Sequence, residues 1–218
     1  MEGAHDGRGA GTAGRTDVSL FARGWVVASP LLERFGLGDS RRRLVAGLRG
    51  TVVEVGAGSG VTFEHYPPAV TRVVAVEPDP HLRAHAGRYA ARAAVPVEVV
   101  DTVAETLPLA DGEADAVVFG LVLCTVPDVP AALAEARRVL VPGGELRLLE
   151  HVRADGRLGA VADRIAPAWS RLGGGCRPNQ DTRRLLREAG FDVSALRTRP
   201  FPPGVPLMPM LTGAARPR

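Results

Sequence analysis

The sequence contains no lysine, a single isoleucine and two cysteines in 218 residues, and these shortages narrow the classes of protein it can represent. Cys124 and Cys176 cannot form a disulfide framework, and neither has a Cys or His nearby at zinc-finger spacing, so we expect a reducing cytoplasm. All 27 basic residues are arginine, which together with abundant Ala, Gly, Pro and Val is typical of a GC-rich bacterial genome. The net charge of +3 therefore does not predict a nucleic-acid partner.

Long apolar runs are also missing. No stretch approaches the roughly 20 residues that a membrane span requires, and the first residues lack the charged-then-apolar pattern of a secretory signal. We therefore expect no membrane association. Residues 1–16 are rich in glycine and have little to bury, which indicates a flexible tail. With 45% hydrophobic and 23% charged residues overall, the chain is typical of one soluble globular domain.

Helical periodicity comes first along the chain. Apolar residues recur at helical spacing over 17–35, where Pro30 marks a kink or a helix start, and a second short helix is predicted over about 39–48. The three consecutive arginines at 41–43 indicate a solvated helix face. Residues 17–50 are thus predicted to be a helical segment that precedes the core.

After residue 50 the pattern changes to short β-rich runs separated by helical stretches. Nearly continuous apolar runs suit strands that are buried on both faces of a parallel sheet, and their alternation with helices is typical of a doubly wound α/β fold. Pro209 predicts that the last strand lies on an edge of the sheet. The predicted strands are 51–55, 72–76, 97–100, 116–119, 145–149, 191–197 and about 207–214, and the predicted helices are about 61–65, 80–94, 129–140 and 181–189.

A glycine loop, GAGSG at 56–60, directly follows the first predicted strand. Glycine lets the backbone turn tightly and approach a ligand, and the N–H groups of the helix start that follows suit a carboxylate or a phosphate. The second strand ends at Glu77, 21 residues beyond Gly56, where a carboxylate can accept hydrogen bonds from both hydroxyls of a ribose. The combination predicts a nucleoside-binding half-site at the carboxyl edge of the sheet.

The glycine spacing separates two kinds of nucleoside cofactor. A dinucleotide fingerprint needs glycine at its sixth position, where this sequence has Val61, so the pattern here is GxGxG. It resembles motif I of the class I methyltransferases that use S-adenosylmethionine. The sequences AETLPLADGEADAVV at 104–118 and AEARRVLVPGG at 134–144 are similar to stretches of small-molecule methyltransferases related to the ubiquinone and menaquinone biosynthesis enzymes. The resemblance implies a Rossmann-like, mostly parallel sheet of seven strands, with S-adenosylmethionine as cofactor and S-adenosylhomocysteine as product.

Further segments resemble the animal membrane-associated thiol methyltransferases and their soluble bacterial relatives. They are FEHYPP at 63–68, LVLCTV at 121–126, EHV at 150–152, and Trp169 paired with the Gly-Cys at 175–176. The animal proteins have an amino-terminal membrane anchor, which we do not expect here. In such relatives the amino-terminal segment forms a lid over the cofactor and an insert shapes the acceptor pocket. The resemblance thus implies a lid at 17–50 and a core at 51–218 whose insert lies at about 152–180.

The same resemblance implies which residues bind the cofactor. The loop glycines would line its methionine end, Glu77 would hold the ribose and Pro78 would pack beside the adenine. Many relatives have an aspartate that meets the adenine amino group just before the Ala-Glu pair at 104–105, but Val103 stands at that position here. The backbone at the end of the fourth strand would meet the amino group of the cofactor's methionine. The predicted cofactor-binding residues are Glu54, Gly56, Gly58, Gly60, Glu77, Pro78, Ala104, Glu105, Phe119 and Leu121.

On the acceptor side, methyl transfer mainly requires alignment and the exclusion of water. A thiol forms its thiolate with modest help, whereas a hydroxyl needs a positioned base. His151, just after the fifth strand, is the predicted base; equally, it could hydrogen-bond a loop. His81 and His85 have no third ligand nearby, so no metal is predicted. The predicted acceptor-binding residues are His65, Tyr66, Cys124, Trp169 and Cys176.

Several functions stay open at this point. The leading expectation is S-methylation of a small-molecule thiol, and the alternative is O- or C-methylation of a hydroxyl or an activated carbon of a metabolite. More distant alternatives are a non-catalytic cofactor-binding protein and a nicotinamide-dependent oxidoreductase. The oxidoreductase is disfavoured by Val61 and by the absence of lysine, which rules out a Tyr-x-x-x-Lys pair.

Overall fold

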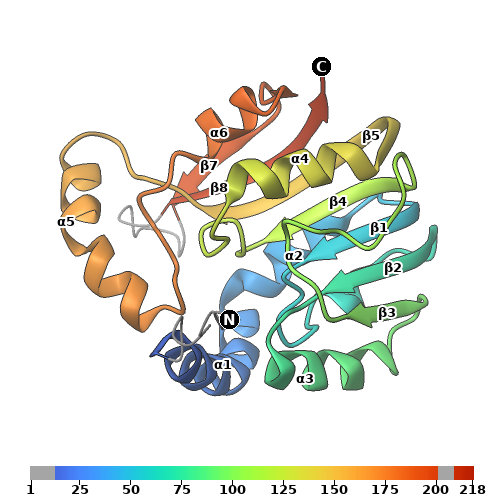
Figure 1. Ribbon diagram of the computed structural model, residues 1–218, viewed down its shortest axis with the longest axis horizontal. Helices are drawn as coiled ribbons and strands as arrows, with labels where there is room; N and C mark the ends of the chain where they lie inside the picture. The colour runs from blue at the N-terminus through green and yellow to red at the C-terminus, as the bar shows by residue number, and fades with distance from the viewer. Residues whose placement is uncertain (1–12, 201–208) are drawn as a thin grey trace, which may run out of the picture.

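The computed structural model describes residues 13–200 and 209–218, and side chains from Phe21 onward. These residues form one twisted sheet with helices on both faces (Figure 1). The predicted tail up to residue 12 and the first residues of the predicted last strand lie outside the described residues. In the part of the chain that is described, no helix has both the length and the apolar character that crossing a bilayer requires.

Within the described residues the sheet has eight strands in the order β3-β2-β1-β4-β5-β8-β6, with β7 paired to β8. The first five strands run parallel to one another, and β8 runs antiparallel to β5, β6 and β7. The strands are β1 (Gly50–Val55), β2 (Val70–Val76), β3 (Val97–Val100), β4 (Ala114–Gly120), β5 (Leu140–His151), β6 (Phe191–Asp192), β7 (Arg197–Pro200) and β8 (Pro209–Pro217). The doubly wound, mostly parallel fold predicted from the sequence is confirmed.

The predicted helices appear in the predicted order, with one additional helix in the insert. The helices are α1 (Ala13–Leu32), η1 (Glu33–Leu37), α2 (Gly38–Val45), η2 (Phe63–His65), α3 (Pro80–Ala90), α4 (Val129–Val139), α5 (Gly156–Leu172) and α6 (Thr182–Glu188). The chain bends within η1, where Gly36 has a φ of 104°. Pro30 lies inside α1. The bend between the two amino-terminal helices is therefore produced by the glycine, whose missing Cβ permits a positive φ.

The prediction that the last strand lies on an edge is wrong. β8 is an interior strand, because it pairs with β5 on one side and with β6 and β7 on the other. Pro209 is the first residue of this strand, which is a position where the lack of an N–H donor costs little. The proline therefore marks the start of the strand and carries no information about its neighbours.

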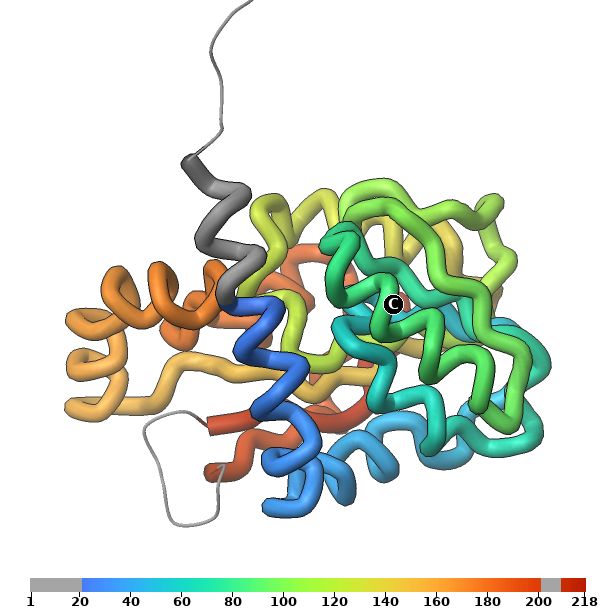
Figure 2. Tube along the Cα trace, turned by 90° about the horizontal axis from the view of Figure 1, so that it is seen from below, coloured from blue at the N-terminus to red at the C-terminus, as the bar shows by residue number. Residues whose placement is uncertain are grey.

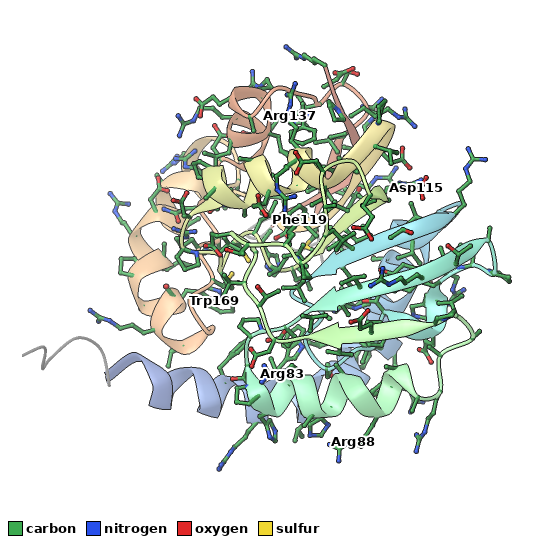
Figure 3. All side chains as sticks on the ribbon, turned by 45° about the vertical axis from the view of Figure 1, so that its right-hand side comes forward. Arg83, Arg88, Asp115, Phe119, Arg137 and Trp169 are labelled. Atoms are coloured by element: carbon green, nitrogen blue, oxygen red, sulfur yellow. The ribbon has the colours of Figure 1, made fainter. Side chains whose placement is uncertain are left out.

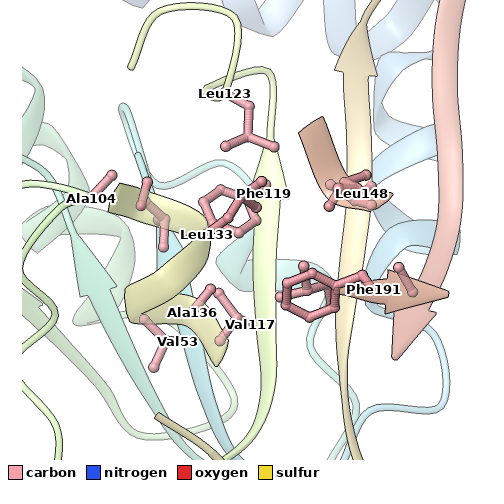
Figure 4. Packing of buried hydrophobic residues seen from close by; sticks show 14 of the residues in the cluster. Val53, Ala104, Val117, Phe119, Leu123, Leu133, Ala136, Leu148 and Phe191 are labelled. Carbon is pink, nitrogen blue, oxygen red and sulfur yellow. The ribbon is translucent and has the colours of Figure 1, made fainter. Parts of the chain in front are cut away.

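Two hydrophobic clusters, one on each face of the sheet, hold the layers together. One joins β1, β4 and β5 to α4 and α6 and is centred on Phe119, Leu133 and Phe191 (Figure 4). The other joins the opposite face to α2, η2 and α3 through residues such as Leu44, Phe63 and Ala86. Parallel strands that are covered on both faces account for the nearly continuous apolar runs of the sequence.

Helix α5 was not predicted from the sequence, where its residues belong to the insert at about 152–180. It stands beside the sheet at the left of Figure 1, and α1 contacts both it and α3. Apolar side chains at helical spacing remain partly exposed along it, among them Leu158, Val161 and Ile165. The helix lies beyond the carboxyl end of β5, beside the edge of the sheet at which a doubly wound fold binds its ligand.

Truncation of the core should cost far more than the same change at the surface. Leu133 of α4 is 0% exposed and Leu172 is 82% exposed. We expect Leu133→Ala to lower the free energy of unfolding by about 2–5 kcal/mol through lost burial and a residual cavity, and Leu172→Ala to change it by less than about 0.5 kcal/mol. Urea denaturation followed by circular dichroism measures both, and equal losses would contradict the packing described here.

Candidate active site

The loop after β1 turns on three glycines with positive φ. Gly56, Gly58 and Gly60 have φ angles of 67°, 59° and 86°. A Cβ added at Gly56 would lie 2.2 Å from the side chain of Val122, so no larger residue fits there without displacing the neighbouring loop. The Gly56 N–H donates to the carbonyl of Val76 at 2.8 Å, which fixes the loop against the end of β2.

Glu77 follows β2 and faces the glycine loop. Its Oε2 accepts a hydrogen bond from the Gly58 N–H at 2.8 Å, and its Oε1 accepts one from the Asp79 N–H at 2.9 Å. Burial raises the pKa of Glu77 to about 7, and the two backbone hydrogen bonds and Arg83 oppose that rise. The carboxyl group thus lies at the carboxyl end of β2, directly beside the glycine loop.

The segment predicted to follow the adenine edge lies after β3. Ala104 is buried, whereas Val103 is 44% exposed and Pro78 is exposed. Oε1 of Glu105 accepts a hydrogen bond from the Asp128 N–H at 3.1 Å. That bond ties the segment to the start of α4 and leaves Glu105 half-buried.

The backbone at the end of β4 is strained. Leu121 has a φ of 63° and is the only residue other than glycine with a positive φ in the described part of the chain. Its N–H donates to the carbonyl of Leu149 in β5 at 2.7 Å, which holds it in this conformation. Phe119 lies two residues earlier, and its side chain is fully buried in the core (Figure 4). Only the backbone of Phe119 is therefore available to a ligand.

Glu150 holds the next part of the same loop. It is fully buried at the end of β5, and its Oε1 accepts hydrogen bonds from the N–H groups of Val122 at 2.8 Å and Leu123 at 3.0 Å. Its other oxygen, Oε2, has no hydrogen-bond partner among the described residues. Burial raises the pKa of Glu150 to about 7 despite these hydrogen bonds. The sequence analysis did not single out this residue, although an acidic residue within an apolar strand is itself a signal.

Three of the predicted acceptor-side residues form one cluster. Three side-chain atoms lie within 4.8 Å of one another: the thiol sulfurs of Cys124 and Cys176 and a ring nitrogen of His151. The pKa of Cys176 lies well below that of an ordinary thiol. The hydrogen bond with the Cys124 thiol is the largest cause, and His151 and Trp169 lower the pKa further. The hydrogen bond with Cys176 and the burial of the side chain raise the pKa of Cys124. Figure 3 shows Trp169 on the side of α5 that faces the sheet.

Hydrogen bonds brace the two cysteine-bearing segments against each other. The backbone N–H of Arg177 donates to the carbonyl of Cys124 at 2.8 Å, and its guanidinium donates to the carbonyls of Cys124 and Val126. Gln180 Nε2 donates to the carbonyl of Leu123 at 3.1 Å. Arg177 therefore organises the loop after β4, and its guanidinium is already committed to protein carbonyls.

Helix α1 lies across this edge of the sheet, between α5 and α3 (Figure 2). Phe21 and Trp25 stack with ring centroids 5.9 Å apart. A Cβ added at Gly58 would lie 3.7 Å from Nε1 of Trp25, and one added at Gly174 would lie 2.5 Å from the Phe21 ring. The two aromatic rings thus bridge the glycine loop and the turn that precedes Cys176.

A buried polar network lies beneath the glycine loop, on the α2 side of the sheet. Tyr66 donates to Oε2 of Glu54 at 2.9 Å, and Arg41 donates to Thr62 at 3.2 Å and to Glu33 at 3.0 Å. Burial raises the pKa of Glu54, while Thr62, Tyr66 and Arg41 oppose that rise; burial and Glu54 raise the pKa of Tyr66.

Three residues of this region have surroundings that the sequence did not predict. Arg41, read as part of a solvated helix face, is 5% exposed, because it is the cation that offsets the acidic groups of the network. Tyr66, predicted to bind the acceptor, is 4% exposed, and its hydroxyl is committed to Glu54. His65 lies in η2 beside Glu64 and is not part of the Cys124, His151 and Cys176 cluster.

The geometry defines the class of protein: a doubly wound α/β fold with a glycine loop, an acidic residue at the next strand and a separate polar cluster at the same edge. The comparisons agree. The family model described as "Methyltransferase domain" matches residues 53–148. The chain is 34% identical over 170 residues to human thiol S-methyltransferase TMT1B, covering 75% of this chain and 69% of that protein. It is also 34% identical over 152 residues to human TMT1A, covering 67% and 62%.

Solved structures show the same fold. An S-adenosylmethionine-dependent methyltransferase from Thermotoga maritima matches with a TM-score of 0.62 and 25% identity, over 90% of this chain and 93% of that one. A Burkholderia thailandensis N1-methyltransferase, solved with S-adenosylhomocysteine and 1,6-didemethyltoxoflavin bound, matches with a TM-score of 0.66 and 17% identity, over 98% and 94%. This chain belongs to the class I S-adenosylmethionine-dependent methyltransferases and is, within that family, a relative of the TMT1 proteins.

The buried network makes a prediction that two adjacent arginines test. Arg41→Ala would leave the buried Glu54 and the half-buried Glu33 without their cation, so we expect the free energy of unfolding to fall by about 3–5 kcal/mol. Arg42 pairs with Asp39 at the surface, with the two side chains 66% and 60% exposed. Arg42→Ala should therefore cost no more than about 1 kcal/mol. Urea denaturation of both variants is the measurement, and similar losses would show that the network does not stabilise the fold.

Proposed function

We propose that this enzyme transfers the methyl group of S-adenosylmethionine to the sulfur of a small-molecule thiol. The observation that carries the proposal is the 34% identity over 170 residues to a human protein named thiol S-methyltransferase. The half-buried imidazole of His151 at the carboxyl edge supports it, since an imidazole close to an acceptor thiol stabilises the thiolate.

In this proposal the cofactor lies along the carboxyl ends of β1, β2 and β4. The backbone of the glycine loop lines the methionine portion, and the Glu77 carboxylate accepts hydrogen bonds from the ribose hydroxyls. Pro78 and Ala104 pack beside the adenine, and the backbone from Phe119 to Leu121 meets the amino group. Glu54 acts from beneath the loop, through its hydrogen bond with Tyr66.

We assign the role of lid to the amino-terminal helices, and that of acceptor-pocket wall to the insert. Trp25 already lies beside Gly58, and Phe21 packs on Gly174. A helix that touches both the glycine loop and the insert covers the space between them and excludes water from the reacting atoms, which an in-line displacement requires.

The chemical step is a direct displacement. The acceptor sulfur attacks the methyl carbon, a new carbon–sulfur bond forms, and the methyl–sulfonium bond breaks with its electron pair remaining on S-adenosylhomocysteine. The proton of the thiol leaves before or during attack, and His151 is the group placed to take it. Because a thiol ionises readily, the protein needs less base strength than it would for a hydroxyl.

The Glu77 contact predicts a pH dependence of cofactor binding. A carboxylate accepts hydrogen bonds from two hydroxyls, whereas a protonated carboxyl group must donate one itself. Since the pKa of Glu77 is raised to about 7, its ionised fraction grows as the pH rises through neutrality. We expect the Kd for S-adenosylhomocysteine, measured by calorimetry, to fall by up to about 10-fold between about pH 6 and about pH 8.

Glu77→Gln is the matched control, because the amide keeps the shape of the side chain and does not titrate. This variant should bind S-adenosylhomocysteine more weakly than the wild type at about pH 8, with a flatter pH profile. If both proteins show the same pH dependence, the titrating group is not Glu77.

The acceptor proposal is tested with two compounds that differ only in the acceptor atom. With S-adenosylmethionine present, we expect 2-mercaptoethanol to give S-methylated product and an equal amount of S-adenosylhomocysteine, and ethylene glycol to give neither. Mass spectrometry quantifies both products. Turnover of the diol at the rate of the thiol would point to O-methylation, and no turnover of a panel of aliphatic and aromatic thiols, by a protein that binds S-adenosylhomocysteine, would refute the proposal.

A further inference from the structure

The Cys124, His151 and Cys176 cluster has the composition of a metal site. It contains two thiols and one imidazole whose ligand atoms lie within 4.8 Å of one another, among the residues that the structure describes. Thiolate sulfur and imidazole nitrogen are the ligands that zinc prefers, and catalytic zinc sites use three protein ligands with the fourth position open. The sequence predicts no metal, because these residues lie far apart in the chain.

We propose that Cys124, His151 and Cys176 bind a zinc ion whose fourth coordination position takes the sulfur of the acceptor. The second half of this statement rests on the thiol acceptor proposed above; the metal site itself does not. Zinc–sulfur bonds of about 2.3 Å in a tetrahedron place two ligand sulfurs about 3.8 Å apart. The observed spacing therefore needs a contraction of about 1 Å at most to reach that geometry.

The surroundings of the cluster are already ordered for this purpose. Each ligand comes from a different segment: the loop after β4, the end of β5 and the turn after α5. Glu150 fixes the first segment through the N–H groups of Val122 and Leu123, and Arg177 and Gln180 fix the third segment to the first. A metal ion would thus enter a site whose backbone is held by buried hydrogen bonds.

Within the part of the chain that the structure describes, two buried atoms of this region have no hydrogen-bond partner. They are Nδ1 of His151 and Oε2 of Glu150. A buried polar atom without a partner costs free energy, so its presence needs an explanation. A cation bound by the cluster supplies one, because it can coordinate the imidazole and offset the charge of the neighbouring carboxylate.

The site would also serve the reaction. Two cysteine thiolates balance the charge of Zn²⁺. With the metal bound, His151 acts as a ligand in place of the base described above, and a bound acceptor thiol loses its proton to solvent and becomes a thiolate. The complex then carries one net negative charge, opposite in sign to the sulfonium. After attack, the sulfur is a neutral thioether, a weaker zinc ligand, and is released together with S-adenosylhomocysteine.

The test uses the full chain under reducing conditions, stripped with a chelator and titrated with Co²⁺ as a spectroscopic substitute for zinc. We expect one Co²⁺ per chain, with sulfur-to-cobalt charge-transfer absorption and the strong visible bands of tetrahedral cobalt, both abolished by added Zn²⁺. Cys176→Ser should weaken binding by at least about 10-fold. His85→Ala is the control, because His85 lies on α3 beside His81 and away from the cluster.

Retained binding of S-adenosylhomocysteine shows that Cys176→Ser is folded, and His151→Ala is a second variant expected to lose Co²⁺. Failure of the wild type to bind Co²⁺ in stoichiometric amount, or equal binding by Cys176→Ser, would overturn the metal site. Addition of 2-mercaptoethanol should add charge-transfer intensity in the wild type and in His85→Ala, and not in Cys176→Ser or His151→Ala. Thiol methylation at full rate by the metal-free protein would overturn the role of zinc and leave the proposed function intact. Stoichiometric Co²⁺ binding without turnover of any thiol would uphold the metal site and refute only the acceptor.

Discussion

The geometry of the active-site edge depends on one buried carboxylate. Oε1 of Glu150, at the end of β5, accepts the N–H groups of Val122 and Leu123. These bonds set the course of the chain where it leaves β4. The same turn places Val122 against Gly56 and carries Cys124 to the neighbourhood of His151. A buried acid that accepts two backbone hydrogen bonds is a strong local constraint, because losing either partner leaves a polar group unpaired. The cofactor side and the acceptor side therefore share one support.

A second support links the amino-terminal helices to the glycine loop from below. Arg41 of α2 bonds to Glu33 and to Thr62, and Thr62 and Tyr66 interact with Glu54 of β1. The base of the proposed lid is thus held by charge in a buried setting, whereas its upper part touches the site through the Phe21 and Trp25 rings.

The cofactor half of the site was predictable from the sequence because its parts are local. Gly56 and Glu77 lie at the ends of adjacent parallel strands, and the alternation of strand and helix is sufficient to bring such ends together. Arg41 was misread because a run of three arginines carries no sign of which one turns inward. Tyr66 was predicted to bind the acceptor, and the sequence pattern gave no sign that its hydroxyl donates to Glu54 of β1. In both cases the deciding contact was a long-range one.

The acceptor half could be predicted only as a set of residues, not as a structure. Cys124, His151, Trp169 and Cys176 were each named from a resemblance, yet their meeting depends on α5, which was not predicted, and on the brace from Arg177 and Gln180. Spacing rules for metal ligands describe sites built within one loop or one helix face. When the residues come from two strand ends and the turn after a helix, their spacing in the sequence carries no signal, and only the three-dimensional fold shows that they meet. Because β4 and β5 are adjacent parallel strands, Cys124 and His151 lie near each other at the same edge of the sheet. An insert that brings Cys176 back to this edge completes the cluster of three residues.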